Sequence, residues 1–439
     1  MIKYLIKGGK PLKGAVRIGG AKNSSFKLMI ASLLAQGESR LLDISRIGDV
    51  EVTKKVIKSL GGGVKSPGEG TIFINPDKID SFKIPKQLAY MSRGSMMFAG
   101  PLLARFGQAD IPLPGGCKIG KRPVERHLEG LQALGAKLNY HNCSVHISTD
   151  RLIGTKYRFD KNTHTGTETL IMAAVLASGT TVLENAALEV EVDDLIEFLN
   201  KMGAKIKRLP DRVIKVEGVK KLKGVIHKAI PDRNEAVSYA CAALATKGDI
   251  IIENACADHL TAFLEKVKQA GGGFETDDFG IRFWYKGPLK ATKMITGPHP
   301  GFMTDWQPLW ATLMTQAQGE SEIIEAVYEY RFAYINDLNK MGAKIKTFNP
   351  DIKDPKSFYN FNLSDDKPGN KHAIKVQGPT SLNGVNLEVP DIRAGATLML
   401  AALIAKGKSV LIDSGHIQRG YEDLDVCLKK LGADIEKIK

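Results

Sequence analysis

The segment Leu113–Glu125 reads LPGGCKIGKRPVE and places a cysteine, Cys117, beside two glycines. Glycine and proline at this density are typical of a loop rather than of a strand or helix. Lys118, Lys121 and Arg122 add positive charge around the sulfur, which favours the thiolate and lowers the pKa of a cysteine. The pattern therefore predicts a reactive thiol on a loop, and a loop cysteine without a function is the alternative.

A second unusual segment, residues 297–307, reads GPHPGFMTDWQ and leads into an apolar helix. Its carboxylate, Asp305, precedes that helix directly. An aspartate in this place can cap the helix by accepting hydrogen bonds from free backbone N–H groups. It can equally be a carboxylate that serves a site at the start of the helix, and both interpretations stay open here.

Basic residues recur at the expected starts of other apolar helices, at Lys22, Arg93, Arg233 and Arg393. A helix N-terminus already carries partial positive charge, so a cation there is unfavourable unless an anion compensates it. Repeated placement at several helix starts predicts a site for phosphates or carboxylates. Arg419 adds a further cation in the segment HIQRGY.

The elements that must position these residues come from an internal repeat. One signature is a helix that ends in an apolar residue and a glycine before a strand begins, and we expect this glycine to be left-handed. It occurs six times, at Gly61, Gly135, Gly203, Gly271, Gly342 and Gly432. A second signature, out of phase with the first, is an apolar helix of small residues that ends in glycine before another strand. Its glycines are Gly37, Gly107, Gly179, Gly248, Gly319 and Gly407.

Six copies of both signatures predict an α/β fold of two domains, each built from three similar units. Each unit reads as strand, amphipathic helix, strand, buried helix, strand. Residues 192–202 show the amphipathic helix, with Leu195, Phe198 and Leu199 on one face, and residues 170–177 show the buried helix, which is apolar all round. The last unit is longer by an excess at Thr347–His372, which we expect to be a surface loop or hairpin.

Composition describes a soluble globular protein, with 43% hydrophobic and 25% charged residues in 439. The net charge of +14 is spread along the chain without a dense basic run, so no nucleic-acid partner is expected. No apolar run is long enough to span a bilayer; Phe26–Ala35 is short and Lys27 interrupts it. We therefore expect a cytoplasmic protein that contacts no membrane. No CxxC or Cys/His cluster occurs, so no metal is expected.

Several of these motifs together resemble the UDP-N-acetylglucosamine 1-carboxyvinyltransferases, enolpyruvyl transferases that are related to the shikimate-pathway enzymes. The matching motifs run along nearly the whole chain. They are Gly20-Ala21-Lys22-Asn23, Pro114-Gly115-Gly116-Cys117, Pro231-Asp232-Arg233, Pro298-His299-Pro300, Thr304-Asp305, Asp391-Ile392-Arg393-Ala394 and Arg419-Gly420-Tyr421-Glu422. The cysteine loop is specific, because the shikimate-pathway enzymes lack that cysteine.

The resemblance implies a two-lobed, inside-out α/β barrel in which each lobe is a pseudo-threefold repeat of a small α/β unit. Residues 22–231 would form one lobe, and residues 1–21 with 232–439 the other, because the first strand of the family joins the second lobe. Phosphoenolpyruvate and UDP-N-acetylglucosamine would be the substrates, and a monomer without a cofactor is expected.

The resemblance also implies a role for each matching residue. Cys117 would protonate carbon 3 of phosphoenolpyruvate and could form a covalent adduct with it, Asp305 would accept the proton of the sugar 3-hydroxyl, and phosphate would leave. Lys22, Arg93, Arg122, Arg393 and Arg419 match phosphoenolpyruvate-binding positions, and Asn23 matches a residue that holds the tetrahedral intermediate. The sugar nucleotide would contact Arg122, Pro123, Val124, Glu125, Arg126, Asn162, Thr163, His164, Thr165, Gly166 and Val327.

The chain departs from the family pattern mainly where the sugar nucleotide would bind. Glu125 stands where the family usually has Asp, Asn162 where it has Lys, and the residues from His164 to Thr167 replace a more apolar loop. Two alternatives therefore stay open, a transferase on a related acceptor and a catalytically silent paralogue that binds UDP-sugars.

Overall fold

The computed structural model describes residues 1–113 and 124–438, and it divides them into two compact units. Unit 1 comprises Met1–Gly19 and Pro231–Lys439, and unit 2 comprises Gly20–Ile230. Each unit has its own continuous hydrophobic core. The chain therefore passes between the units twice, at Gly19–Gly20 and at Ile230–Pro231, and each unit is described by itself below.

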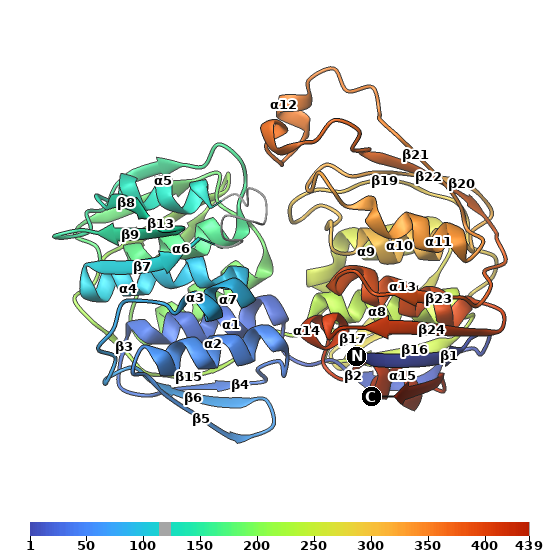
Figure 1. Cartoon of the computed structure of the whole chain (residues 1–439), viewed down its shortest axis with the longest axis horizontal. Coiled ribbons are helices and arrows are strands. Elements are labelled where there is room, and N and C mark those ends of the chain that lie inside the picture. The colour runs from blue at the N-terminus through green and yellow to red at the C-terminus, as the bar shows by residue number, and fades with distance from the viewer. Residues whose placement is uncertain (114–123, 439) are drawn as a thin grey trace. The chain divides into compact units, whose positions relative to one another are not determined.

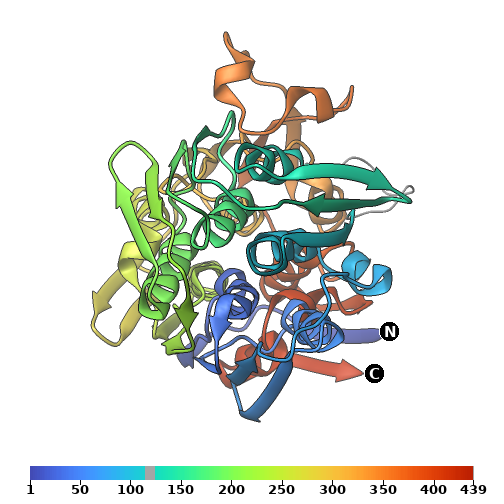
Figure 2. The same cartoon turned by 90° about the vertical axis from the view of Figure 1, so that its left-hand side faces the viewer.

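Three larger sheets, a two-stranded sheet of β3 (Ala35–Gln36) and β14 (Leu222–Lys223), and a set of helices make up unit 2 (Figure 1). Its helices are α1 (Lys22–Ala31), α2 (Gly48–Ser59), α3 (Lys86–Met91), η2 (Arg93–Phe98), α4 (Ala99–Phe106), α5 (Glu125–Ala133), α6 (His164–Ala174) and α7 (Val190–Met202). The sheets have the strand orders β15-β4-β6-β5, β7-β9-β8 and β10-β11-β13-β12. These strands are β4 (Ser39–Leu42), β5 (Gly63–Gly68), β6 (Thr71–Asn75), β7 (Gln108–Pro112), β8 (Lys137–His141), β9 (Ser144–Ser148), β10 (Lys156–Arg158), β11 (Thr180–Glu184), β12 (Lys205–Leu209), β13 (Val213–Glu217) and β15 (Ile226–Lys228). Figure 2 shows the β8–β9 hairpin, in teal, extending away from the helices of this unit.

Unit 1 repeats the same plan with three four-stranded sheets. Its inner helices are α8 (Arg233–Ala245), α10 (Gln307–Met314) and α13 (Ile392–Ile404), which pack on one another; α9 (Thr261–Ala270), α11 (Ile335–Lys340), α14 (His416–Gly420) and α15 (Leu424–Lys430) complete the set. The sheets are β23-β24-β1-β25, β17-β18-β16-β2 and β19-β20-β22-β21. The strands are β1 (Ile2–Lys7), β2 (Lys13–Arg17), β16 (Asp249–Glu253), β17 (Gly273–Asp277), β18 (Gly280–Trp284), β19 (Lys293–Ile295), β20 (Gly319–Ile324), β21 (Lys344–Phe348), β22 (Ala373–Gly378), β23 (Asn386–Glu388), β24 (Lys408–Asp413) and β25 (Asp434–Ile438).

The predicted inside-out arrangement is confirmed, because the apolar helices lie inside the sheets. Every described residue of α10 is buried, from Gln307 to Met314, and α8 is buried from Glu235 to Ala245. Strands instead alternate buried residues with partly or fully exposed ones, as in β13 and β16, so each sheet has one face on the core and a more exposed opposite face. The N-terminal strand β1 pairs with β24 and β25 at the far end of the chain, with Ile2 opposite Asp413 and Lys3 opposite Ile438.

The six glycines of the first signature all adopt a left-handed backbone, as predicted. Their φ angles lie between 79° and 109°, a region that costs residues with a Cβ atom free energy. In the second signature one glycine differs. Lys247 takes the positive φ of 57° in place of Gly248, whose added Cβ would lie 2.0 Å from the carbonyl oxygen of Leu12. Gly248 is therefore required by a close backbone approach rather than by its φ angle.

The predicted order of elements within each repeat lacks strands that the structure contains. Between an amphipathic helix and the next buried helix the structure has a hairpin and then a short strand, as in β12, β13 and β15 between α7 and α8. The short strand β15 runs parallel to β4, the first strand of another repeat within unit 2, with Ile226 opposite Arg40. Three residues are too few for a two-residue periodicity to stand out, so sequence reasoning missed these strands.

The segment expected to be a surface loop or hairpin is the connection between the paired strands β21 and β22. It contains a short helix, α12 (Pro355–Phe358), and a turn, η6 (Leu363–Asp365), that project from the rest of unit 1 (Figure 1). It is more than surface loop, because Tyr359 and Phe361 are buried and form a small separate core with Ala326. His372 stacks on both rings, at centroid distances of 5.1 and 5.2 Å.

Candidate active site

The structure describes most of the predicted site residues and divides them between the two units. Cys117, Arg122 and Pro123 lie outside the described residues, and for Arg93 only the backbone, at the start of η2, is described. Unit 2 holds the predicted residues at the starts of α1, α5 and α6. Unit 1 holds those around α10, α13 and α14 and after β20.

Cations do stand at the starts of the inner helices, but protein groups already compensate several of them. Lys22 is the first residue of α1, followed by Asn23, and its ammonium lies 3.1 Å from the carboxylate of Asp49 in α2. Arg233 is the first residue of α8 and donates to Nδ1 of His299 at 3.0 Å. The expectation that only a bound anion would offset these cations is therefore too simple, because carboxylates within the fold share that role.

Asp305 does not cap the helix that follows it. The N-cap residue of α10 is Trp306, and no side-chain cap hydrogen bond forms there. The carboxylate of Asp305 instead forms a close ion pair with the guanidinium of Arg393, in the first turn of α13, and lies 3.6 Å from Arg331. Burial lowers the pKa of Arg331 and the neighbouring Arg393 lowers it further. Two cations thus share one carboxylate, and the capping interpretation is wrong.

A buried carboxylate, Glu325, organises the chain behind this cluster. Its Oε1 accepts hydrogen bonds from the backbone N–H groups of Val327 and Tyr328, at 2.9 and 3.0 Å, and from the hydroxyl of Thr296 at 2.9 Å. Its Oε2 accepts from the hydroxyl of Thr304 at 2.9 Å. Burial raises the pKa of Glu325. This carboxylate therefore fixes the backbone that carries Val327, a predicted sugar-nucleotide contact.

The Thr304 hydroxyl links Glu325 to the arginines. Thr304 donates its proton to Glu325, and its oxygen accepts from Nε of Arg331 at 2.9 Å. The Arg331 guanidinium also lies over the ring of Tyr328, 4.6 Å from the centroid. Glu325, Thr304, Arg331 and Asp305 thus form one continuous polar chain that orients Asp305.

The helix that carries Arg393 packs tightly against the helix that carries Arg419. Asp391 caps α13 by accepting from the backbone N–H groups of Arg393 and Ala394, at 2.8 and 3.0 Å. A Cβ atom added to Gly420 in α14 would lie 2.0 Å from a side-chain carbon of α13. This glycine therefore permits a contact that holds the start of α13 close to the end of α14.

In unit 2 the structure brings together two predicted segments, at the starts of α5 and α6. Val124 is the N-cap residue of α5 and Glu125 its first residue. The guanidinium of Arg126 lies 3.4 Å from Asp160, just before the predicted loop 162–166. His127 reaches the same loop, with Nε2 3.1 Å from the hydroxyl of Thr165.

Within the loop itself, Thr163 caps α6 by accepting from the backbone N–H of Gly166 at 3.3 Å. A Cβ atom on Gly166 would lie 2.5 Å from the Thr163 methyl group, so the cap requires a glycine there. Asn162 is largely buried and donates to the backbone carbonyl of Asn185 at 3.4 Å. Asn162 thus anchors the loop to the backbone at Asn185 within unit 2.

Sequence reasoning missed the residues that support the predicted ones, namely Asp49, Glu325, Arg331, Lys27 and Glu168. Only Lys27 left a signal, as the charge that interrupts an apolar run, and it is in fact 2% exposed and paired with Glu168. Glu325 stands between Ile324 and Ala326, and Arg331 between Tyr330 and Phe332, but neither context specifies a partner. Nothing in their spacing separates them from solvent-exposed charges.

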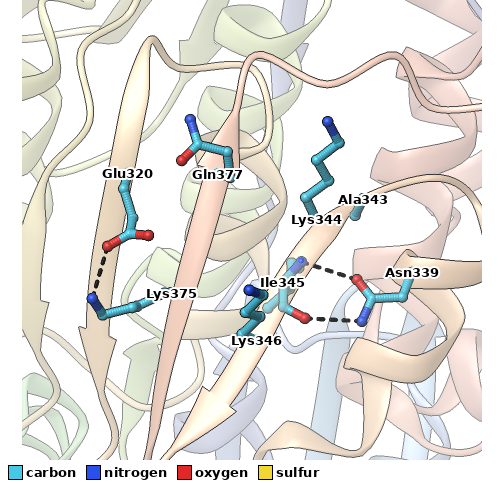
Figure 3. Close-up of a pocket in the computed structure, with 8 residues that line it drawn as sticks. All are labelled: Glu320, Asn339, Ala343, Lys344, Ile345, Lys346, Lys375 and Gln377. Atoms are coloured by element: carbon cyan, nitrogen blue, oxygen red, sulfur yellow. Dashed lines mark hydrogen bonds and ion pairs between the residues drawn. The ribbon is translucent and has the colours of Figure 1, made fainter.

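Two surface cavities lie elsewhere and arise from the repeat. Figure 3 shows the one in unit 1, a cavity of about 400 Å³ where Asn339 holds the backbone of Ile345 and Glu320 pairs with Lys375. A cavity of about 350 Å³ occupies the same place in unit 2. The nonapeptide LNKMGAKIK, at residues 199–207 and again at 338–346, helps build both. Neither is lined by a predicted site residue, so the fold explains them.

Within residues 1–113 and 124–438, no group of three or more His, Cys, Asp or Glu side chains could hold a metal ion. None of its helices combines the length and the apolar character that a membrane span requires.

Comparison with known proteins shows the class of protein to which this fold belongs. The EPSP synthase (3-phosphoshikimate 1-carboxyvinyltransferase) family model matches residues 6–428. The structure of the enolpyruvyl transferase NikO from Streptomyces tendae superposes with a TM-score of 0.87 at 24% identity, over 99% of this chain and 98% of that one. EPSP synthase from Acinetobacter baumannii gives a TM-score of 0.77 at 18% identity over the whole of both chains. The fold is thus that of the enolpyruvyl, or carboxyvinyl, transferases.

Relatives with higher sequence identity show which family of enolpyruvyl transferases the chain resembles. UDP-N-acetylglucosamine 1-carboxyvinyltransferase from Halothermothrix orenii is 39% identical over the full length of both chains. The protein of the same name from Thermodesulfovibrio yellowstonii is 41% identical, again over both full lengths. The chain belongs to the UDP-N-acetylglucosamine 1-carboxyvinyltransferase family, as its motifs predicted.

Proposed function

We propose that this protein transfers the enolpyruvyl group of phosphoenolpyruvate to the 3-hydroxyl of UDP-N-acetylglucosamine and releases phosphate. This reaction is the first committed step of peptidoglycan synthesis. The observation that carries the proposal is the identity of 39–41% to carboxyvinyltransferases of that name over the whole chain. We further propose that units 1 and 2 are the two substrate-binding lobes of the family.

Asp305 is the proposed base for the sugar hydroxyl, and its surroundings support a controlled role. Its carboxylate is paired with Arg393, which is itself a proposed ligand of phosphoenolpyruvate. An anionic substrate that binds Arg393 competes for the same guanidinium. Binding of phosphoenolpyruvate would therefore weaken the ion pair and leave Asp305 a stronger base when the acceptor hydroxyl is in place.

The remaining roles divide by substrate. Cys117 is the proposed acid and site of a possible covalent adduct, and Asn23 would hold the tetrahedral intermediate. Cationic groups would bind the phosphate and carboxylate of phosphoenolpyruvate, for which arginine forks are well suited. These groups are Lys22, Arg93, Arg122, Arg393 and Arg419. The segment from Pro123 to Arg126, the loop from Asn162 to Gly166, and Val327 would contact the sugar nucleotide.

The test is phosphate release from phosphoenolpyruvate with UDP-N-acetylglucosamine, with and without the epoxide antibiotic fosfomycin, which alkylates the matching cysteine in the family. We expect release that fosfomycin stops, together with an adduct on Cys117 by peptide mass spectrometry and none in Cys117→Ser. Release with another acceptor only would move the protein to a related reaction. A folded protein that releases no phosphate with any acceptor would be a silent paralogue.

A further inference from the structure

A buried charge pair joins two inner helices of unit 2. Lys27, in the middle of α1, is 2% exposed, and Glu168, in the first half of α6, is fully buried. The Lys27 ammonium lies 2.8 Å from Oε1 and 2.6 Å from Oε2 of Glu168. Buried pairs of this kind pay a desolvation cost, and apolar residues of similar volume are often as stabilising or more so. Stability of the core alone therefore does not explain the pair.

His164 is the third member of this cluster. Its Nε2 atom lies 2.8 Å from the Lys27 ammonium. Nε2 also lies 3.3 Å from Oε1 of Glu168, but the shorter contact is with the ammonium, which only donates hydrogen bonds. Nε2 therefore accepts from Lys27, and the imidazole carries its proton on Nδ1. His164 is the first residue of α6, and its side chain is 21% exposed. Among the residues that the structure describes, the Nδ1 atom has no hydrogen-bond partner.

A second imidazole, that of His127, fixes the hydrogen-bonding role of the hydroxyl of Thr165, the residue next to His164. The Thr169 hydroxyl donates to the backbone carbonyl of Thr165 at 2.9 Å, so it accepts from Nδ1 of His127 at 3.0 Å. Nε2 of His127 is then an acceptor and receives a hydrogen bond from the Thr165 hydroxyl, 3.1 Å away. Burial lowers the pKa of His127 to about 4, so this arrangement is neutral at ordinary pH. Two adjacent side chains of the loop, His164 and Thr165, thus have their hydrogen-bonding roles fixed from inside the fold.

We propose that Lys27 and Glu168 are positioning residues that orient the His164 imidazole so that Nδ1–H can donate to the diphosphate of the sugar nucleotide. The inference rests on the proposed function, in which the loop 162–166 contacts the sugar nucleotide, and on the family resemblance, which implies that this loop lies under the diphosphate. A donor with a fixed tautomer is ready to bind a phosphate oxygen without reorganisation. The polar residue that replaces an apolar one in this loop therefore serves acceptor recognition, and the buried pair specifies its orientation.

The tautomer can be measured without any substitution. Spectra of the protein labelled with ¹⁵N-histidine distinguish Nδ1–H from Nε2–H imidazoles, and His164→Val identifies the signal among nine histidines. We expect His164 to be the Nδ1–H tautomer in the unliganded protein. An Nε2–H tautomer would overturn the proposal whatever the kinetics show.

Variants then test the effect on substrate. Lys27→Met with Glu168→Leu replaces the pair by apolar residues and leaves no charge uncompensated. We expect KM for UDP-N-acetylglucosamine to rise roughly tenfold, the loss of one hydrogen bond to a charged group, with kcat and KM for phosphoenolpyruvate nearly unchanged. His164→Val, at a partly exposed position, should give the same rise even if the double variant folds poorly. Lys201→Met is the matched control, since Lys201 contacts Nδ1 of His227 at 3.2 Å, outside the proposed loop, and should change none of these constants.

Titration calorimetry with UDP separates this inference from the proposed function. Wild-type protein that binds UDP more tightly than both variants supports the inference even if no turnover is found. Wild-type protein that turns over, with unchanged KM and UDP affinity in the variants, would sink the inference and leave the proposed function intact.

Discussion

Replacement of Glu325 should show how far one buried carboxylate supports the proposed base. Glu325→Ala removes the acceptor of two backbone N–H groups, those of Val327 and Tyr328, and of two hydroxyls. The hydroxyls can turn to new partners, but the backbone donors cannot. Each unsatisfied donor costs about 1–3 kcal/mol, so about 2–6 kcal/mol is at stake. Both backbone groups belong to partly buried residues that water can reach, which favours the lower half of that range.

Glu325→Gln should cost less, about 1–2 kcal/mol. Its carbonyl oxygen can keep the three donors of Oε1, and only the charge-assisted bond from Thr304 is lost. Removal of a buried charge also recovers part of its desolvation cost, which offsets the loss.

The assay can be confined to one unit, because all three tryptophans lie in unit 1, at 284, 306 and 310. Tryptophan fluorescence during urea unfolding therefore reports on unit 1 alone. With a slope of about 3 kcal/mol per M, a loss of 3 kcal/mol lowers the midpoint by about 1 M. Glu320→Ala, in the adjacent strand β20, is the control, since its pair with Lys375 is exposed and such pairs contribute little.

Activity should fall as well, since Thr304 would lose its acceptor and Arg331 and Asp305 their fixed geometry. We expect a lower kcat and a higher KM for the sugar nucleotide in Glu325→Ala. An unfolding midpoint equal to that of wild type would show that water or a shifted loop satisfies these donors. The supporting role assigned to Glu325 would then be wrong.

Three further perturbations test the polar groups elsewhere. Burial and the nearby Asp232 raise the pKa of Glu235 to about 8, so the folded state prefers the protonated form. Stability is therefore lost as pH rises from about 4.5 to 8. The urea midpoint of Glu235→Gln should rise relative to that of wild type across this pH window, and a constant difference between the two would refute the assignment. The lowered pKa of His127 has the opposite effect on stability, because its contribution is full above about pH 6.5 and is lost as pH falls through about 4. The rate of amide exchange in α5 and α6 should rise as pH falls through this window in wild type, and should rise less in His127→Gln. Asp305→Asn should reduce turnover by a factor of about 10² or more while the fluorescence midpoint moves little, since its partner Arg393 is 44% exposed; near-normal turnover would remove Asp305 from the chemistry.

The sequence was most informative where backbone geometry demands one residue type. Six glycines at helix ends predicted six left-handed residues, because few other residues adopt that conformation cheaply. It was least informative about partners. Asp305 could be read as a cap or as a site carboxylate, and only the contact with Arg393, 88 residues away in the chain, decides between them.

Burial was the second quantity that the sequence left open. Lys27 and Lys54 both follow apolar or β-branched residues in helices, yet the side chain of Lys27 is 2% exposed and that of Lys54 is 19% exposed. The difference is made by Glu168, more than a hundred residues away, whose carboxylate makes a buried ammonium tolerable. Periodicity within one helix carries no information on such a partner.

The departures of this chain from its family bear on whether the acceptor site works. A site that has lost its role should accumulate polar residues with no complementary partner, because nothing selects for their orientation. His164 and Thr165 instead have partners that fix both their positions and their hydrogen-bonding roles, and the partner of His164 is an otherwise costly buried charge. Substitutions built into the core in this way are expected of a site that still selects a ligand. This supports a working acceptor site, which a transferase and a UDP-sugar-binding paralogue would share, so phosphate release is the measurement that separates the two.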